Sequence, residues 1–105
     1  MLDGMQQMSE AGKQYGGGDP WFLYVLECSD GSFYTGVTKD IERRLAEHND
    51  GKASKYTRTR RPVRLLYFEN CAGRAEALSR EYQVKRLSRK AKEKLVGTNG
   101  DSSGE

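Results

Sequence analysis

Two strand-forming runs joined by a short turn constrain the fold of this chain more than any other feature. Residues 21–28 read Trp-Phe-Leu-Tyr-Val-Leu-Glu-Cys, and residues 32–37 read Ser-Phe-Tyr-Thr-Gly-Val. Both runs are rich in β-branched and aromatic side chains, which favour strands. The segment between them, Ser-Asp-Gly at 29–31, is typical of a β-hairpin turn. The pattern therefore predicts an antiparallel pair of strands.

The length of the hairpin loop determines where two tyrosines lie. A two-residue loop would put Tyr24 and Tyr34 on opposite faces of the sheet, because side chains alternate along a strand. A three-residue loop with Gly31 in the left-handed region pairs Cys28 with Ser32 instead. The two tyrosines then share a face as diagonal neighbours. We predict the three-residue loop.

The chain has 105 residues, which is enough for one domain. Residues 1–19 and 97–105 contain few large apolar side chains. Neither segment can bury enough surface to offset its loss of conformational entropy, so we expect disordered tails there. The folded domain is expected at residues 20–96.

The folded part of the chain is more basic than the whole. Residues 21–96 contain 17 Lys and Arg against 10 Asp and Glu, a net charge of +7, whereas the whole chain carries +3. Such a surface suits a polyanion, although charge of this size also serves solubility alone.

The two cysteines, Cys28 and Cys71, lie in or beside apolar runs. With a single histidine, they are too few for a structural zinc site. No segment has the length and apolar character needed to cross a bilayer. We expect a monomeric, cytoplasmic protein with reduced thiols and no membrane association.

A helix is predicted directly after the hairpin. Ile41, Leu45 and His48 repeat at helical spacing, and either Thr38 or Asp40 can cap the first turn. The Asn-Asp-Gly sequence at 49–51 ends the helix. Because Arg44 is four residues before His48, their side chains lie on one helix face.

Four further segments complete the expected fold. Residues 51–64 carry six positive charges and no acidic residue, and are expected to form an irregular loop. A strand at 63–69, a helix at 74–87 and a short basic helix at 88–96 follow. The sequence therefore predicts an α/β protein of the α+β type, with a three-stranded antiparallel sheet flanked by helices in the order β-β-α-β-α-α.

Glu81 is a carboxylate on the expected apolar face of the helix at 74–87. That face is formed by Ala77, Leu78, Val84 and Leu87. A carboxylate among them must be paired or bind a metal, since an unpaired buried charge is costly. It could be a ligand of Mg²⁺, or it could form an ion pair with Arg44, Arg80 or Lys85. Spacing alone favours neither role.

Four more side chains are candidates for phosphodiester chemistry. Tyr34 could act as a base if positive charge from Arg44, His48 and a metal at Glu81 stabilised its phenolate, and Tyr24 is its neighbour. Arg44 suits bidentate phosphate binding, and His48 could transfer a proton. Each has a structural alternative: packing in the strand for the tyrosines, a solvated charge for the arginine, and a core position for the histidine.

The basic segments are candidates for nucleic-acid binding. Lysines and arginines with one interleaved tyrosine are expected to contact a phosphate backbone, although a solvated flexible loop would look similar. The candidates are Lys52, Lys55, Tyr56, Arg58, Arg60, Arg61, Lys85 and Arg89.

The chain resembles the GIY-YIG nuclease family. Leu-Tyr-Val at 23–25 resembles the GIY triplet, and Tyr-Thr-Gly at 34–36 resembles the YIG triplet. Residues 34–48 follow the YIG-x-T-x-(D/N)-(L/I)-x-x-R-(L/W)-x-x-H signature, and residues 74–81 are similar to the helix that carries the metal glutamate. The similarity spans residues 21–95, as in small stand-alone bacterial members of the family.

The resemblance implies a fold and a set of roles. The site would lie on one face of a three-stranded sheet and use a single Mg²⁺ or Mn²⁺ ion bound by Glu81. Tyr34 would deprotonate the attacking water with help from Tyr24, Arg44 would hold the scissile phosphate, and His48 would transfer a proton or donate a hydrogen bond.

Three functions are compatible with these features. The first is a metal-dependent endonuclease that hydrolyses DNA, with or without a protein partner that delivers the substrate. The second is a nucleic-acid-binding module with the same fold and little catalysis. The third is an adaptor that docks onto a repair or replication complex.

Overall fold

The computed structural model describes residues 20–100, with side chains described as far as residue 97. Most of the two expected tails, at 1–19 and 101–105, lies outside the described residues. The elements follow the predicted order, with one added short helix: β2 (Trp21–Glu27), β3 (Phe33–Thr38), α2 (Ile41–Asn49), α3 (Lys55–Arg58), β4 (Arg64–Cys71), α4 (Arg74–Lys85) and α5 (Arg89–Gly100). The strands form an antiparallel sheet in the order β3-β2-β4, which confirms the predicted α+β fold.

The hairpin between β2 and β3 has the predicted three-residue loop. Cys28 N–H donates to the Ser32 carbonyl at 2.8 Å, and Gly31 N–H donates to the Cys28 carbonyl at 2.9 Å. Gly31 has φ 86°, in the left-handed region. Tyr24 is paired with Gly36 across the ladder, so Tyr34 is its diagonal neighbour on the same face.

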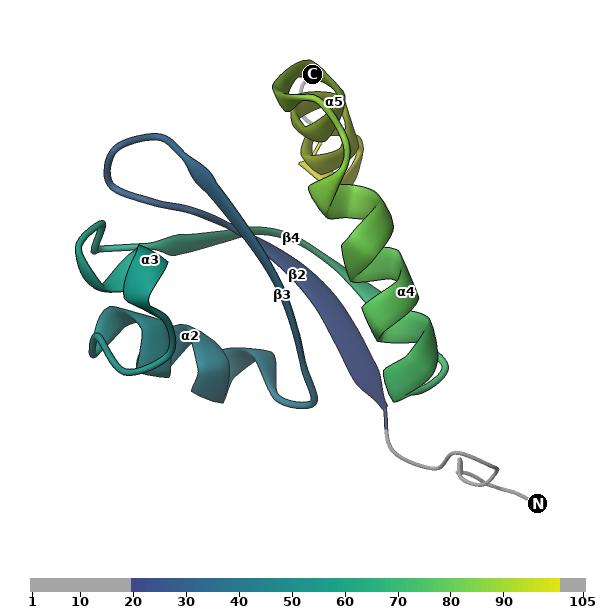
Figure 1. Ribbon diagram of the computed structural model, residues 1–105, viewed down its shortest axis with the longest axis horizontal. Coiled ribbons are helices and arrows are strands. Elements are labelled where there is room, and N and C mark those ends of the chain that lie inside the picture. The colour runs from purple at the N-terminus through teal and green to yellow at the C-terminus, as the bar shows by residue number, and fades with distance from the viewer. Residues whose placement is uncertain (1–19, 101–105) are drawn as a thin grey trace.

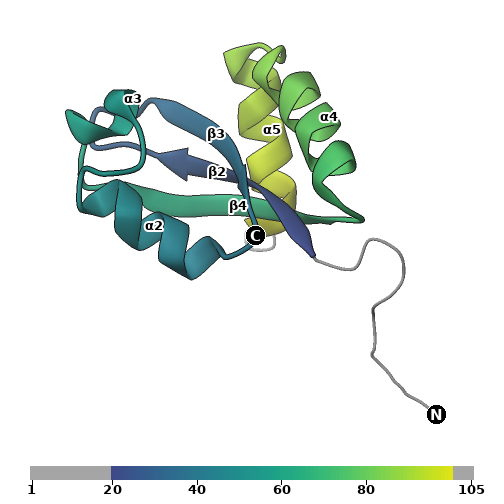
Figure 2. The ribbon, with the colours of Figure 1, turned by 60° about the horizontal axis from the view of Figure 1, so that its bottom comes forward.

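The two faces of the sheet are covered by different helices. Leu23 and Val25 on β2 pack with Ala77 and Val84 of α4. Tyr24, next to them in sequence, points to the other face and belongs to a second apolar cluster. Figures 1 and 2 show α4 and α5 on one side of the sheet and α2 and α3 on the other. The edge strand β3 therefore lies between the two helical layers.

Helix α2 begins and ends as its sequence predicts. Asp40 is the N-cap, and its Oδ1 accepts from Arg43 N–H at 3.1 Å. Thr38, the other candidate, instead accepts from Asp40 N–H at 3.1 Å. The helix ends at Asn49, and Gly51 follows with φ 79°.

Three expectations about the later elements are wrong in detail. The segment 51–64 is not wholly irregular, because Ser54 caps a single helical turn, α3, by accepting from Thr57 N–H at 3.1 Å. Helix α4 ends at Lys85, and Leu78 and Leu87 are exposed because only a narrow stripe of the helix meets the sheet. The last helix runs to Gly100, past the expected boundary at 96. None of the described helices has the length and apolar character needed to cross a membrane.

Candidate active site at the edge strand

A buried chain of hydrogen bonds connects three elements beneath β3. The Tyr24 hydroxyl lies 2.9 Å from Nε2 of His48, and Nδ1 of the same ring lies 2.8 Å from the Thr57 hydroxyl. Tyr24 is 3%, His48 1% and Thr57 0% exposed. Thr57 is fixed in turn by Ser54, whose Oγ is 3.2 Å from the Thr57 hydroxyl. Strand β2, helix α2 and helix α3 are thus joined by one polar network inside the core.

Gly36 is what allows the Tyr24 phenol to reach His48. A Cβ atom at position 36 would lie 2.5 Å from Tyr24 Oη and 2.7 Å from Cζ. Real Cβ atoms do not come so close, so any other residue would push the ring aside. The glycine of the Tyr-Thr-Gly triplet therefore has a steric role.

Burial sets the protonation of both rings. The pKa of His48 is lowered, first by burial and then by the nearby charge of Arg44, while Glu47 opposes the shift. The pKa of Tyr24 is raised, mainly by burial and also by Tyr34, while Arg44 opposes the shift. At neutral pH both side chains are therefore uncharged. The lowered pKa of His48 argues against the expectation that it supplies positive charge to the site, and leaves Arg44 near Tyr24 and Lys85 and Lys92 beside Tyr34 as the cations.

Tyr34 lies next to this network and is more accessible. Its ring centroid is 5.0 Å from that of His48 in an edge arrangement, and it is stacked on Tyr56 at 6.0 Å with an interplanar angle of 24°. Tyr34 and Tyr56 line a groove of about 270 Å³ together with Lys85 and Lys92. Of Tyr24 and Tyr34, Tyr34 is therefore the one whose side chain borders a groove open to a ligand.

Arg44 and Glu81 approach the tyrosines from different helices. Arg44 Nε is 3.3 Å from Glu47 Oε1 on α2, and Glu81 Oε2 is 3.1 Å from Lys85 Nζ on α4. The charges of Arg44 and Glu81 both influence the pKa of Tyr24, Arg44 lowering it and Glu81 raising it. Helix α4 packs on the opposite face of the sheet from Tyr24. The predicted place of Glu81 in a site on one face of the sheet therefore stays a prediction.

Of the ion-pair partners considered for Glu81, the structure shows Lys85. Arg80 is instead held by Glu69, with Nε 2.7 Å from Oε1 and Nη2 2.8 Å from Oε2. This bidentate pair connects α4 to β4 and lowers the pKa of Glu69. It fixes the rotation of α4 and so the direction in which Glu81 points.

Glu81 fits a single-carboxylate magnesium site. No group of three or more His, Cys, Asp or Glu gathers within residues 20–97, so a closed protein site of the zinc type does not fit there. Mg²⁺ is commonly held by one or two carboxylates, with water and substrate phosphate as the other ligands. The side chain of Glu81 is 20% exposed, so it is not sealed from an ion, and its Oε2 is paired with the exposed Lys85.

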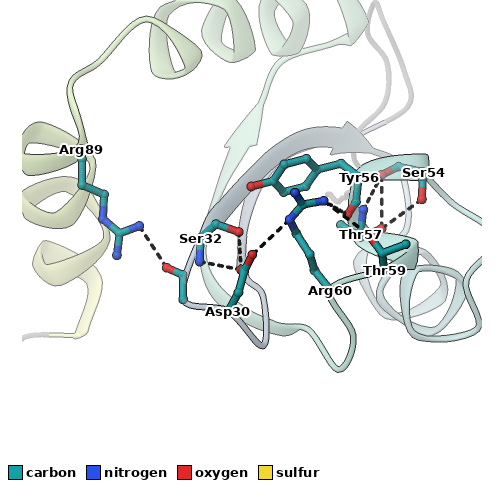
Figure 3. A network of polar contacts seen from close by, with 9 residues as sticks. Asp30, Ser32, Ser54, Tyr56, Thr57, Thr59, Arg60 and Arg89 are labelled. Atoms are coloured by element: carbon teal, nitrogen blue, oxygen red, sulfur yellow. Dashed lines mark hydrogen bonds and ion pairs between the residues drawn. The ribbon is translucent and has the colours of Figure 1, made fainter.

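Several residues expected to bind nucleic acid are used in internal contacts. The Arg60 guanidinium lies 3.9 Å from the Tyr56 ring centroid and donates to Asp30 Oδ2 at 3.1 Å. Arg89 donates to the Gly31 carbonyl at 3.0 Å. Figure 3 shows these contacts connecting the hairpin turn to α3 on one side and α5 on the other.

The remaining candidates are spread around the same end of the molecule. Arg61 donates to the carbonyls of Arg58 and Asn49. Lys52, Lys55 and Arg58 are exposed on or before α3. Lys85 is exposed on α4, beside the 270 Å³ groove.

Thr57 is the residue of the network that sequence reasoning missed. Thr57 belongs to no sequence motif, and its separation from His48 by nine residues gives no periodic signal. The Ser54-x-x-Thr57 pattern could have predicted a capped turn, but not that the threonine contacts the histidine.

A family model described as the GIY-YIG catalytic domain matches residues 20–94. The chain belongs to this family. A UPF0213 protein of Staphylococcus saprophyticus is 50% identical over 78 residues, which cover 74% of this chain and 95% of that protein. A UPF0213 protein of Halobacterium salinarum is 55% identical over 73 residues, which cover 70% of this chain and 95% of that protein.

Two solved structures share the fold. The solution NMR structure of a UPF0213 protein from Bacillus halodurans gives a TM-score of 0.52 at 48% identity, covering 78% of this chain and 87% of that one. A protein from E. faecalis gives 0.53 at 46% identity, covering 75% and 84%. Both the family membership and the α+β fold expected from the sequence are confirmed.

Proposed function

We propose that this protein is a metal-dependent nuclease that hydrolyses phosphodiester bonds in DNA. The observation that carries the proposal is the arrangement at β3. A groove-lining tyrosine, Tyr34, lies against the neutral Tyr24–His48 pair, and the charges of Arg44 and Glu81 are close enough to act on Tyr24. These residue types together can activate water, bind a phosphate and hold a divalent cation.

In the proposed reaction, Tyr34 Oη takes a proton from a water molecule. The resulting hydroxide forms a bond to phosphorus as the bond from phosphorus to the leaving oxygen breaks. Tyr34 acts as a phenolate in this step and becomes a phenol when it takes the proton. A divalent cation held by Glu81 would supply charge stabilisation of the leaving oxygen.

The buried network acts as a positioning device in this proposal. A phenol and a neutral imidazole in contact are best satisfied when the Tyr24 hydroxyl donates to Nε2 of His48. Nδ1 then carries the proton and donates to the Thr57 hydroxyl. The hydrogen bonds to Tyr24 and Thr57 together favour this His48 tautomer, and the ordered imidazole supports the ring of Tyr34.

The proposed role of Glu81 as a metal ligand provides the experiment that tests the nuclease proposal. Purified protein is incubated with Mg²⁺ and a labelled panel of single-stranded, duplex, flap and branched DNA. Glu81→Gln should lose at least about a hundredfold in cleavage rate while binding DNA as well as the wild type. Glu76→Gln, which removes an exposed carboxylate from the first turn of the same helix, is the matched control and should cleave normally.

Two results would contradict the proposal. Equal cleavage by Glu81→Gln and the wild type would remove Glu81 from the site. Binding of DNA without cleavage of any substrate would favour the binding-module alternative.

A further inference from the structure

A second groove lies at the other end of β3, beyond Arg44. It has a volume of about 510 Å³, and its apolar wall is formed by Trp21, Val37 and Leu78. Arg44 also lines this groove, so it adjoins the proposed phosphate-binding position. A volume in this range suits a small organic ligand or a single nucleotide unit.

Cations surround the apolar wall of this groove. The Arg74 Cζ atom lies 6.0 Å and the Lys39 Nζ atom 5.9 Å from the Trp21 ring. Arg43 also lines the groove. Among the described residues, the acidic side chains that line it are Asp40 and Glu47, against four cations, so positive charge is in excess there. An aromatic wall bordered by guanidinium groups is complementary to a base joined to a phosphate.

We propose that this groove binds an unpaired nucleotide of the substrate strand, adjacent to the phosphate held by Arg44. The inference rests on the proposed function and specifies its substrate class. A duplex presents phosphates and sugars at its surface, and these do not match an apolar wall. The face of a base is available to Trp21 only where the nucleotide is unpaired, as in a flap, a frayed end or a single strand.

Trp21 is the only tryptophan of the chain, so its fluorescence reports on this groove. The protein is titrated in EDTA, which prevents metal-dependent cleavage, with oligothymidylate and with a blunt hairpin duplex. Binding is followed in parallel by anisotropy of a label on the DNA. We expect oligothymidylate to quench Trp21 emission and the blunt duplex to leave it nearly unchanged.

Arg74→Gln tests the cationic side of the groove. Arg74 is exposed in the first turn of α4, so its replacement leaves the core intact. It should weaken oligothymidylate binding about tenfold and reduce the quenching amplitude. The matched control is Arg64→Gln, which removes the same charge at the opposite end of β4 and should change the affinity less than about threefold.

Four results would overturn the inference. They are oligothymidylate binding without a change in Trp21 emission, equal quenching by the blunt duplex, equal effects of Arg74→Gln and Arg64→Gln, and no binding of either DNA. The outcome is separate from that of the nuclease proposal. Quenching in a protein that fails to cleave with Mg²⁺ would contradict only the nuclease activity, and cleavage without quenching would contradict only the groove assignment.

Discussion

At the scale of single residues, the site depends on a close approach between a phenol and the backbone of the neighbouring strand. The Tyr24 ring lies against Gly36, and its hydroxyl contacts Nε2 of His48. The other ring nitrogen of His48, Nδ1, contacts the Thr57 hydroxyl. Each of these groups is almost completely buried, so each hydrogen bond has no competing water. Loss of one partner would leave a buried polar atom unsatisfied.

Gly36→Ala should displace the Tyr24 ring. The added methyl would lie 2.5 Å from the phenol oxygen, so we expect a loss of about 1–3 kcal/mol in the free energy of unfolding and a strong loss of cleavage. Chemical denaturation measures the first effect. Gly73→Ala is the control, because a Cβ there meets no atom within 4 Å, and it should cost less than about 1 kcal/mol. Equal stability of the two variants would argue against the steric role of Gly36.

Thr57→Val should weaken the preference of His48 for the tautomer that carries its proton on Nδ1. Valine has the shape of threonine but cannot accept a hydrogen bond from Nδ1, so the ring loses its fixed orientation at a cost of about 1–3 kcal/mol. ¹⁵N chemical shifts of the imidazole report which nitrogen carries the proton. Thr57→Ser keeps the hydroxyl and should retain the wild-type shifts. An unchanged spectrum in Thr57→Val would show that Thr57 does not set the tautomer.

At the scale of elements, the hairpin and α2 could be predicted because local chemistry specifies them. Gly31 and Gly51 supply the left-handed positions, and Asp40 supplies the cap. Helix α3 could not be predicted in this way, because a single turn is too short to show helical periodicity. Its capping by Ser54 is local, but its contact with His48 is tertiary.

The rotation of α4 about its own axis also could not be predicted from the sequence. Periodicity placed Leu78 with Ala77 and Val84, yet Leu78 lines a groove at the edge of the sheet. The ion pair between Arg80 and Glu69, which sets the helix rotation, joins residues with no motif in common. For the same reason the sequence could not choose a partner for Glu81.

Arg60→Ala should loosen α3. The side chain connects the Tyr56 carbonyl, at 2.9 Å, to Asp30 of the hairpin turn, so its removal frees this end of the element. Backbone amides of residues 54–60 should exchange with solvent faster, with little change in β2. Arg58→Ala, an exposed position on the same turn, is the comparison. Identical exchange in the two variants would show that the Arg60 contacts do not hold α3.

At the scale of the whole molecule, His48 and Glu69 are the two more buried groups that couple stability to pH below neutrality. The pKa of His48 is lowered by burial from its ordinary 6.5, and the pKa of Glu69 is lowered by Arg80 from its ordinary 4.5. In both cases the unfolded chain binds protons more readily than the folded one, so stability rises with pH. The stability that these two groups contribute should be fully present above pH 6.5. It should fall first as His48 is protonated, and again below about 4.5 as Glu69 is protonated.

Denaturation series at several pH values test this coupling. Glu69→Gln should lower stability at neutral pH and flatten the decrease below about 4.5, because the titrating group is gone. Stability that rises on acidification from neutral pH would contradict the assignment of a neutral, buried His48.

The most direct test of the central claim compares two tyrosine variants in DNA cleavage with Mg²⁺. Tyr34→Phe removes the hydroxyl that we assign to water activation and should lower the cleavage rate by at least about a hundredfold, with DNA affinity retained. Tyr82→Phe removes a hydroxyl from the exposed side of α4 and should cleave at the wild-type rate. If Tyr34→Phe cleaves as fast as Tyr82→Phe, Tyr34 is not the base and the account of the site is wrong.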